Sequence, residues 1–176
     1  MGKDEPVPFL LAAKQAGDFD EAYFVYAHGP HVFPHPMPDG YVGTARPWYK
    51  EAAAANKAVV TAPYVDATTG KLTITFAEPI SESGTLTAIV GTDMHLDSVT
   101  RKVNGIRATN KSFAFLLDDA GNILAYANAE LVLKPATAIA PALTTSLMAG
   151  LAQSGGHTEV DVSGATQLVY AARVEG

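Results

Sequence analysis

The sequence contains no cysteine and comparatively little charge. The absence of cysteine excludes disulfide bonds, thiolate catalysis and cysteine-ligated zinc. Charged residues make up 17% of the 176 residues, below the usual quarter, and the formal net charge is −6 without any basic run. An acidic chain of this kind argues against binding to nucleic acid or to an anionic membrane surface.

Long hydrophobic runs are also absent. No stretch reaches the eighteen or more apolar residues that a membrane-spanning helix needs. The first ten residues, MGKDEPVPFL, are too charged for a signal peptide, and the proline at position 6 departs from a myristoylation motif. The composition fits a soluble protein and equally a fragment of a larger one.

Motifs for nucleophilic catalysis and nucleotide binding are missing as well. The chain has no Gly-x-Ser-x-Gly, no P-loop and no dinucleotide fingerprint. Asp66 and Asp93 could act as paired carboxylates in acid–base chemistry, but no nucleophile or metal motif accompanies them. We therefore expect no enzymatic activity and no cofactor.

Five histidines raise the question of a metal site. His28, His31 and His35 lie within eight residues of one another, among prolines in a predicted hairpin and loop. No carboxylate is held near them by helical spacing, so we expect no bound metal. His95 and His157 are isolated, and we expect them at the surface or at element ends.

The predicted elements fall into two similar sets, of which the first occupies the N-terminal half. A short helix at 8–17 is ended by a glycine, and a strand pair at 21–33 surrounds a Gly-Pro turn. A helix at 47–56 starts with proline, which suits a first helical turn. β-Branched strands follow at 58–65, 71–80 and 85–94, and the last is apolar enough to lie centrally in a sheet.

The second set repeats this layout after a predicted connecting helix at 96–105. A strand pair at 112–128 has aspartates at 118–119 in its turn. A loop and helix occupy 135–155, and a final strand pair occupies 157–174. Antiparallel strands with helices on one face predict two α+β modules.

One decapeptide, YVGTARPWYK at 41–50, concentrates hydrogen-bond donors. Arginine, the indole N–H and the tyrosine hydroxyl can recognise a carboxylate while the rings supply aromatic walls. The same residues could instead form a helix start with two aromatic side chains in a core. Spacing alone leaves both interpretations open.

Acceptors follow further along the chain. Tyr64 and Asp66 lie at the turn end of one predicted strand, and Asp93 ends another. If these segments converge, Arg46 with the Trp48 N–H would meet a carboxylate, while the aspartates with a tyrosine would meet an ammonium. An α-amino acid carries both groups on one carbon.

This pattern resembles the double-Cache (dCache) sensor domains of bacterial and archaeal chemoreceptors and sensor kinases, in their amino-acid-binding branch. The resemblance covers roughly residues 9–173. In that branch a tyrosine precedes Arg-x-Trp-Tyr, a Tyr-x-Asp follows in the next strand, and a later Asp completes the pattern. Every position is filled in this sequence: Tyr41, Arg46, Trp48, Tyr49, Tyr64, Asp66 and Asp93.

The resemblance implies an α+β fold of two tandem PAS-like modules, each an antiparallel sheet with flanking helices. The long N-terminal helix typical of the family is largely missing. Residues 1–19 would be its remnant, 20–94 the membrane-distal ligand-binding module, 95–110 a connecting helix and 111–176 the membrane-proximal module.

The resemblance also implies a function. The chain would be the periplasmic or extracellular ectodomain of a membrane receptor that binds an L-amino acid and signals. The protein would contact the membrane only through flanking transmembrane helices outside this sequence. A homodimer is compatible with the full-length receptor. Arg46 and Trp48, helped by Tyr41, would hold the carboxylate. The ammonium would be surrounded by Tyr49, Tyr64, Asp66 and Asp93.

Three alternatives remain open from the sequence. The site could bind an amine or a short carboxylate, although an amine alone would not require Arg46. An enzyme could use Asp66 and Asp93. The residues could also be core aromatics and turn aspartates without a ligand. Candidates for the side-chain end of a ligand pocket are Tyr23, Val25, Met37 and Phe76.

Overall fold

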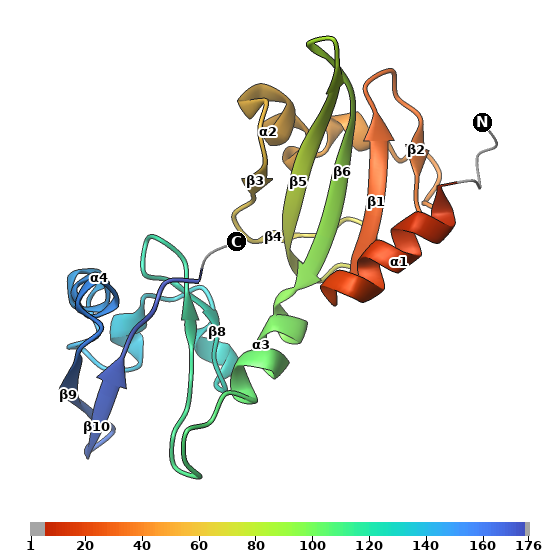
Figure 1. Cartoon of the computed structure of the whole chain (residues 1–176). Coiled ribbons are helices and arrows are strands. Elements are labelled where there is room, and N and C mark those ends of the chain that lie inside the picture. The colour runs from red at the N-terminus through yellow and green to blue at the C-terminus, as the bar shows by residue number, and fades with distance from the viewer. Residues whose placement is uncertain (1–5, 175–176) are drawn as a thin grey trace. The chain divides into compact units, whose positions relative to one another are not determined.

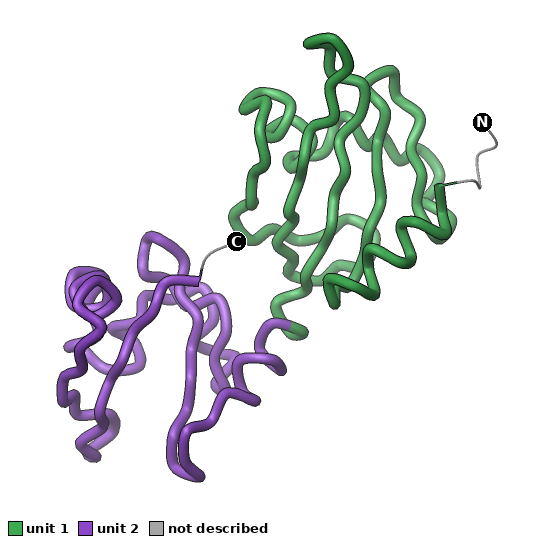
Figure 2. Tube along the Cα trace, in the orientation of Figure 1, with its two compact units in different colours: residues 1–98 green, residues 99–176 purple. Residues whose placement is uncertain are grey.

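The computed structural model describes residues 6–174 and divides the chain into two compact units, residues 1–98 and 99–176 (Figure 2). Two expected segments extend beyond the described residues. These are the helix remnant at 1–19, of which 1–5 are not described, and the second module at 111–176, of which 175–176 are not described. Within the described part, no helix is both long enough and apolar enough to cross a membrane.

Unit 1 is built on a six-stranded antiparallel sheet (Figure 1). The strand order is β2-β1-β6-β5-β3, and β4 also pairs with β5. β6 therefore lies in the middle, as its apolar sequence predicted. The strands are β1 (Glu21–Tyr26), β2 (His31–Val32), β3 (Val59–Val60), β4 (Tyr64–Val65), β5 (Leu72–Glu82) and β6 (Thr85–His95).

The long hairpin of β5 and β6 organises this sheet. Its strands are rich in β-branched residues, and its two-residue turn places Ser83 and Gly84 at φ 49° and 79°. The segment before it differs from the single strand expected at 58–65. It divides into β3 and β4 because Pro63 has no N–H to donate to a continuous ladder.

The helices of unit 1 begin and end where the sequence predicts. α1 (Val7–Gly17) packs against β1, and α2 (Pro47–Ala55) packs against β5 and β6 (Figure 1). A 3-10 turn at Gly43–Ala45 precedes α2, and Asn56 ends α2 in the left-handed conformation at φ 50°. The core between α2 and the sheet consists of Tyr23, Val25, Trp48, Tyr49, Ala52, Ala77 and Ile89.

A third helix, α3 (Leu96–Asn104), follows β6 directly. Its start is held by Asp20, which precedes β1. One carboxylate oxygen of Asp20 accepts from the backbone N–H of His95 at 2.9 Å, and the other accepts from the Ser98 hydroxyl at 2.7 Å. The backbone N–H of Asp20 donates to the carbonyl of Asp93 at 2.8 Å. Asp20 therefore ties the end of β6 to the first turn of α3.

Unit 2 contains antiparallel strand pairs and one α-helix, as expected, but its strands form two separate two-stranded sheets. Thr144 caps α4 by accepting from the backbone N–H of Leu147 at 3.2 Å. Asp118 is a turn residue as predicted, because it accepts from the backbone and side-chain nitrogens of Asn122 at 2.7 and 3.0 Å. The elements are β7 (Leu116–Leu117), β8 (Ile123–Ala125), the 3-10 turns Ala129–Leu131 and Ala136–Ala138, α4 (Thr145–Ser154), β9 (His157–Val162) and β10 (Ala165–Tyr170).

The core of unit 2 is aliphatic. Its buried residues come from β8, the second 3-10 turn, the loop before α4, α4 itself and the last strand pair. They are Ile123, Ala136, Ala140, Leu143, Leu151, Val160 and Val169.

Candidate functional site

The face of the unit 1 sheet that packs on α2 also carries a buried polar cluster. Successive side chains of a strand alternate between the two faces, and the strand register decides which of them meet. Thr75 of β5 lies opposite Asp93 of β6, and Tyr23 of β1 lies opposite Gly91. Two strands that flank β6 thus bring side chains to Asp93.

Asp93 is the centre of this cluster and is 5% exposed. Its Oδ1 accepts from the Tyr23 hydroxyl at 2.8 Å and from Thr75 Oγ1 at 2.6 Å. Thr75 Oγ1 also lies 2.7 Å from the Tyr64 hydroxyl. Since the single hydroxyl proton of Thr75 goes to Asp93, Tyr64 donates to Thr75. The result is a relay from Tyr64 through Thr75 to Asp93.

The second carboxylate oxygen of Asp93, Oδ2, differs from Oδ1 in its surroundings. Among the described residues, none donates a hydrogen bond to Oδ2. Among the described residues, every side-chain nitrogen or oxygen that is fully buried has a hydrogen-bond partner. An atom without a partner, such as Oδ2, is therefore not fully buried. Oδ2 therefore borders open space, although the residue as a whole is buried.

Burial raises the pKa of Asp93 from 3.8 to about 6. Hydrogen bonds from Thr75 and Tyr23 act in the opposite direction, because they stabilise the carboxylate, while the charges of Asp66 and Glu21 raise the pKa further. Burial and the charge of Asp93 likewise raise the pKa of Tyr64. The cluster is thus a desolvated anion held by hydroxyl donors, which favours a cationic partner.

Arg46 and Tyr41 contact each other. Arg46 is the residue that precedes α2, and its Cζ lies 5.9 Å from the centroid of the Tyr41 ring. Burial raises the pKa of Tyr41 to about 12, Arg46 lowers it, and Asp66 and Asp93 raise it. The charged groups of the site are therefore close enough to influence one hydroxyl. Arg46 forms no ion pair with any carboxylate in the described part of the chain.

Trp48 and Tyr49 lie in the first turn of α2 and belong to the core. Trp48 is 2% exposed, and its ring contacts those of Tyr23 and Tyr49 with centroid distances of 5.1 and 5.8 Å. No acceptor among the described residues receives a hydrogen bond from the Trp48 indole N–H, which, like Asp93 Oδ2, is not sealed from solvent. Trp48 is therefore a core residue, as the core interpretation expected, while its role as a donor to a ligand stays a prediction.

Asp66 directly follows β4 and organises the turn before β5. Its Oδ1 accepts from the backbone nitrogens of Thr68 and Thr69 at 3.0 and 2.8 Å, and from their hydroxyls at 2.6 and 2.9 Å. Partial burial raises the pKa of Asp66, but these hydrogen bonds outweigh it and the net shift is downward. Asp66 is therefore a turn aspartate that stays ionised beside Asp93.

The sequence analysis missed two parts of this cluster. Thr75 received no role, and Tyr23 was considered only for the side-chain end of a ligand. The signal for Thr75 was a polar residue in the middle of an apolar strand. Phe76 was wrongly assigned to the pocket: it follows Thr75, so it points to the other face, where its ring lies 5.9 Å from that of Phe19.

His95 was expected at the surface or at an element end; it is the last residue of β6, but it is not at the surface. It is 8% exposed, and its Nδ1 lies 2.9 Å from Thr73 Oγ1, because it shares the face of β6 that carries Asp93. The three clustered histidines have separate partners. His35 Nε2 lies 2.8 Å from Glu21, while His31 contacts the Tyr41 ring and His28 contacts the Tyr26 ring. The described residues contain no group of three metal-ligating side chains.

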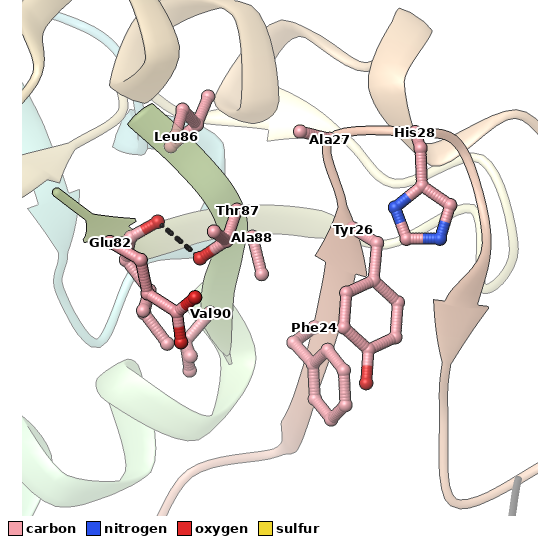
Figure 3. Close-up of a pocket in the computed structure, with 10 residues that line it drawn as sticks. Phe24, Tyr26, Ala27, His28, Glu82, Leu86, Thr87, Ala88 and Val90 are labelled. Atoms are coloured by element: carbon pink, nitrogen blue, oxygen red, sulfur yellow. Dashed lines mark hydrogen bonds between the residues drawn. The ribbon is translucent and has the colours of Figure 1, made fainter. Parts of the chain in front are cut away.

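A groove of about 620 Å³ lies on the opposite face of the sheet (Figure 3). Its lining includes Glu82 and His28 but no arginine or lysine, so it lacks a partner for a carboxylate. Neither Arg46 nor Asp93 lines it, so it is distinct from the candidate site expected from the sequence. Its main lining residues are Phe24, Tyr26, Ile80, Glu82, Ala88 and Val90.

Known proteins match this chain over most of its length. The methyl-accepting chemotaxis protein McpG of Pseudomonas putida is 35% identical over 140 residues, which are 80% of this chain and 21% of McpG. This chain therefore spans about a fifth of that relative.

Solved structures agree with the sequence match. The ligand-binding domain of the Pseudomonas fluorescens chemoreceptor CtaA in complex with L-serine gives a TM-score of 0.69 at 28% identity, covering 92% of this chain and 69% of that chain. The ligand-binding domain of the Pseudomonas aeruginosa chemoreceptor PctB in complex with L-Gln gives 0.65 at 26% identity, covering 92% and 62%. The fold expected from the sequence is thus confirmed.

The family model described as the Cache domain matches residues 9–176. This range agrees with the extent of the resemblance found in the sequence. The chain belongs to the Cache domain family.

Proposed function

We propose that unit 1 binds an L-amino acid through its ammonium and carboxylate groups. The observation that carries this proposal is Asp93, which is 5% exposed and has one oxygen held by two hydroxyls and the other open. A desolvated carboxylate is costly unless a cation pairs with it. An ammonium group at Oδ2 supplies that cation, with the ionised Asp66 nearby.

Arg46 and the Trp48 N–H would bind the carboxylate group of the ligand. Arg46 has no carboxylate partner among the described residues, and the Trp48 N–H has no described acceptor. A guanidinium with an adjacent N–H binds a carboxylate in a geometry that lysine cannot reproduce. Tyr41 and Tyr49 complete the aromatic wall. The CtaA and PctB ligand-binding domains, which were solved in complex with L-serine and L-Gln, support the same ligand class.

The amino acid would act as a signal rather than as a substrate. We propose that the chain is the extracytoplasmic sensor domain of a membrane-anchored receptor, as in the chemoreceptors that it resembles. Residues 20–94 would capture the ligand, 95–110 would connect, and 111–176 would form the membrane-proximal module. Ligand recovered chemically unchanged after binding is the expected result, and product formation would contradict the non-enzymatic role.

The direct test of the carboxylate assignment is Arg46→Ala with isothermal titration calorimetry. A hydrogen bond to a charged group contributes about 1.5–3 kcal/mol, so affinity should fall roughly 10- to 150-fold. Arg46→Lys should restore little of it, because lysine lacks the planar fork. Arg107→Ala is a matched control, since Arg107 is an exposed arginine of unit 2. Near-normal affinity in Arg46→Ala would refute the assignment.

The ammonium assignment is tested by Asp93→Asn with two ligands. Asparagine keeps an oxygen to accept from Tyr23 and Thr75 but removes the charge. The variant should lose at least about tenfold in affinity for the amino acid. Its affinity for the corresponding deaminated acid should change far less. Equal losses for both ligands would show that Asp93 does not face the amino group.

A further inference from the structure

We propose that Tyr23 is a positioning residue of this site: together with Thr75 it clamps Asp93 Oδ1, so that Oδ2 is the oxygen presented to a ligand. The identity of the ligand's cationic group rests on the proposed function, whereas the clamp itself is a property of the unliganded protein. Tyr23 lies outside the seven residues that the family pattern singles out.

The clamp is built from both neighbours of β6. Tyr23 reaches Asp93 from β1 at 2.8 Å, and Thr75 reaches it from β5 at 2.6 Å. A carboxylate held at one oxygen by donors from two sides cannot rotate to exchange its oxygens without breaking both bonds. Oδ2 therefore keeps one direction before any ligand arrives, which reduces the entropy lost on binding.

Gly91 makes the Tyr23 contact feasible. It lies opposite Tyr23 in the sheet, and a Cβ at this position would lie 2.4 Å from Tyr23 Cε2. Only glycine lets the tyrosine ring lie across β6 and extend its hydroxyl to Asp93, two residues further on. Phe33 stacks on the Tyr23 ring at 4.4 Å and Trp48 contacts it at 5.1 Å, so the ring is fixed by packing.

The clamp also favours the charged form of Asp93. Burial opposes the ionisation of Asp93 most strongly, and the like charges of the surrounding carboxylates add to this effect. His95, on the same face of β6, is paired with Thr73. The hydroxyls of Tyr23 and Thr75 favour the ionised form. The titratable groups that face Asp93 from its neighbours are Glu21, Tyr23, Tyr41, Tyr64 and Asp66.

The test is a carboxyl ¹³C NMR titration of Asp93 in the unliganded protein, with the resonance assigned by its loss in Asp93→Asn. Tyr23→Phe keeps the ring and removes only the hydroxyl. The titration midpoint of Asp93 should rise by about one pH unit or more, because a donor to the carboxylate is lost. Thr75→Val, which is nearly isosteric, should raise it similarly, and Thr75→Ser should restore it.

Tyr26→Phe is the matched control, because it removes a hydroxyl from the same strand on the opposite face, where Tyr26 lines the groove of Figure 3. It should leave the Asp93 midpoint unchanged. The proposal is overturned if Tyr23→Phe leaves the midpoint where it was, or if Tyr26→Phe moves it equally. Should Tyr23→Phe not fold, the Thr75→Val and Thr75→Ser pair decides the existence of the clamp by the same criterion.

A ligand titration adds the functional consequence. In Tyr23→Phe the amino-acid affinity near neutral pH should fall about tenfold, and its loss toward acid pH should begin about one pH unit higher than in the wild type. The deaminated acid should bind both proteins alike. If the wild type bound no amino acid, the proposed function would fail, while the NMR titration would still decide the clamp.

Discussion

The two units of the chain share antiparallel strand pairs and helices but differ in what they bury. The core of unit 2 is made of aliphatic side chains, whereas that of unit 1 contains a tryptophan and two tyrosines. Every polar or charged residue that is buried among the described residues lies within 1–98. These residues are Thr61, Thr73, Thr75, Asp93, His95 and Ser98.

This difference supports the proposal that unit 1 binds the ligand and unit 2 has a structural role. Burying a polar group lowers stability unless hydrogen bonds compensate for lost water. In unit 1, Asp93 is a buried carboxylate with one oxygen that has no hydrogen-bond donor among the described residues, so it should lower stability. The described part of unit 2 contains no buried charged side chain. Stability and binding should therefore respond separately to mutations in the two units.

The largest effect on stability is expected in unit 2. Leu143 is 1% exposed in an aliphatic core, so Leu143→Ala should lower the free energy of unfolding by about 2–5 kcal/mol, through lost burial and a cavity. Denaturant unfolding measures the loss. Amino-acid affinity, measured by calorimetry below the melting transition, should stay within about twofold. A large loss of affinity in the folded variant would mean that unit 2 contributes to the site.

A stabilising effect is expected at Asp93 itself. Its pKa is about 6 in the folded protein and near 3.8 in an ordinary environment, so the folded protein holds more protons between these values. Stability therefore falls as pH rises through this window, by up to about 3 kcal/mol. Asp93→Asn without ligand should be more stable than the wild type at about pH 8 by up to this amount.

The advantage of Asp93→Asn should disappear at about pH 4, where the wild-type carboxyl is protonated in the folded state. Thermal unfolding across pH, with each kcal/mol corresponding to roughly 2–4 °C, measures both values. A variant that is less stable than the wild type at about pH 8 would show that the burial of Asp93 is fully compensated.

Gly91→Ala tests how tightly the unit 1 core is filled. The added Cβ would lie 2.4 Å from the Tyr23 ring, which Phe33 and Trp48 hold in place. Overpacking of this kind should lower the free energy of unfolding by about 1–3 kcal/mol and weaken amino-acid binding, because the Tyr23 hydroxyl must move away from Asp93. Unchanged stability and affinity would show that the ring can shift freely.

The smallest effects come from a matched pair of turn aspartates. Asp66 and Asp118 each accept several hydrogen bonds in a turn, one in each unit. Replacing either by alanine should lower the free energy of unfolding by about 1 kcal/mol or somewhat more. Only Asp66→Ala should also weaken amino-acid binding, since Asp66 belongs to the proposed site and its charge acts on Asp93. Equal amino-acid affinities in the two variants would show that Asp66 stabilises its turn but does not contribute to ligand binding.

Much of unit 1 could be predicted because its signals are local. Pro47 and Asn56 mark the ends of α2, and the apolar sequence of β6 indicates a central strand. The candidate site was predictable only from a specific spacing of donors and acceptors, whose assignment to a ligand stays a prediction. The periodicity of apolar residues was enough to predict the helices and strands, but not which residues contact one another across them.

The partners of Asp93 could not be predicted, because they depend on strand register. Tyr23 is 70 residues from Asp93 in the sequence and Thr75 is 18 residues away. A shift of one residue in the β1–β6 pairing would turn Tyr23 to the other face, and no local pattern excludes that shift. The separation of the unit 2 strands into two pairs is likewise a matter of long-range pairing.

The contact of Asp20 with α3 has a consequence for where a minimal binding fragment can be cut. The helix starts after His95, yet its first turn is held by a residue 75 positions upstream that belongs to no strand. A fragment trimmed to begin at β1 would keep the entire sheet and all seven candidate ligand contacts. It would nevertheless lose the carboxylate that receives the His95 N–H and the Ser98 hydroxyl, so the helix should fray from its first turn. The shortest fragment that preserves the junction after β6 therefore runs from Asp20 through the end of α3. Its N-terminal boundary depends on α3, which lies at its C-terminal end.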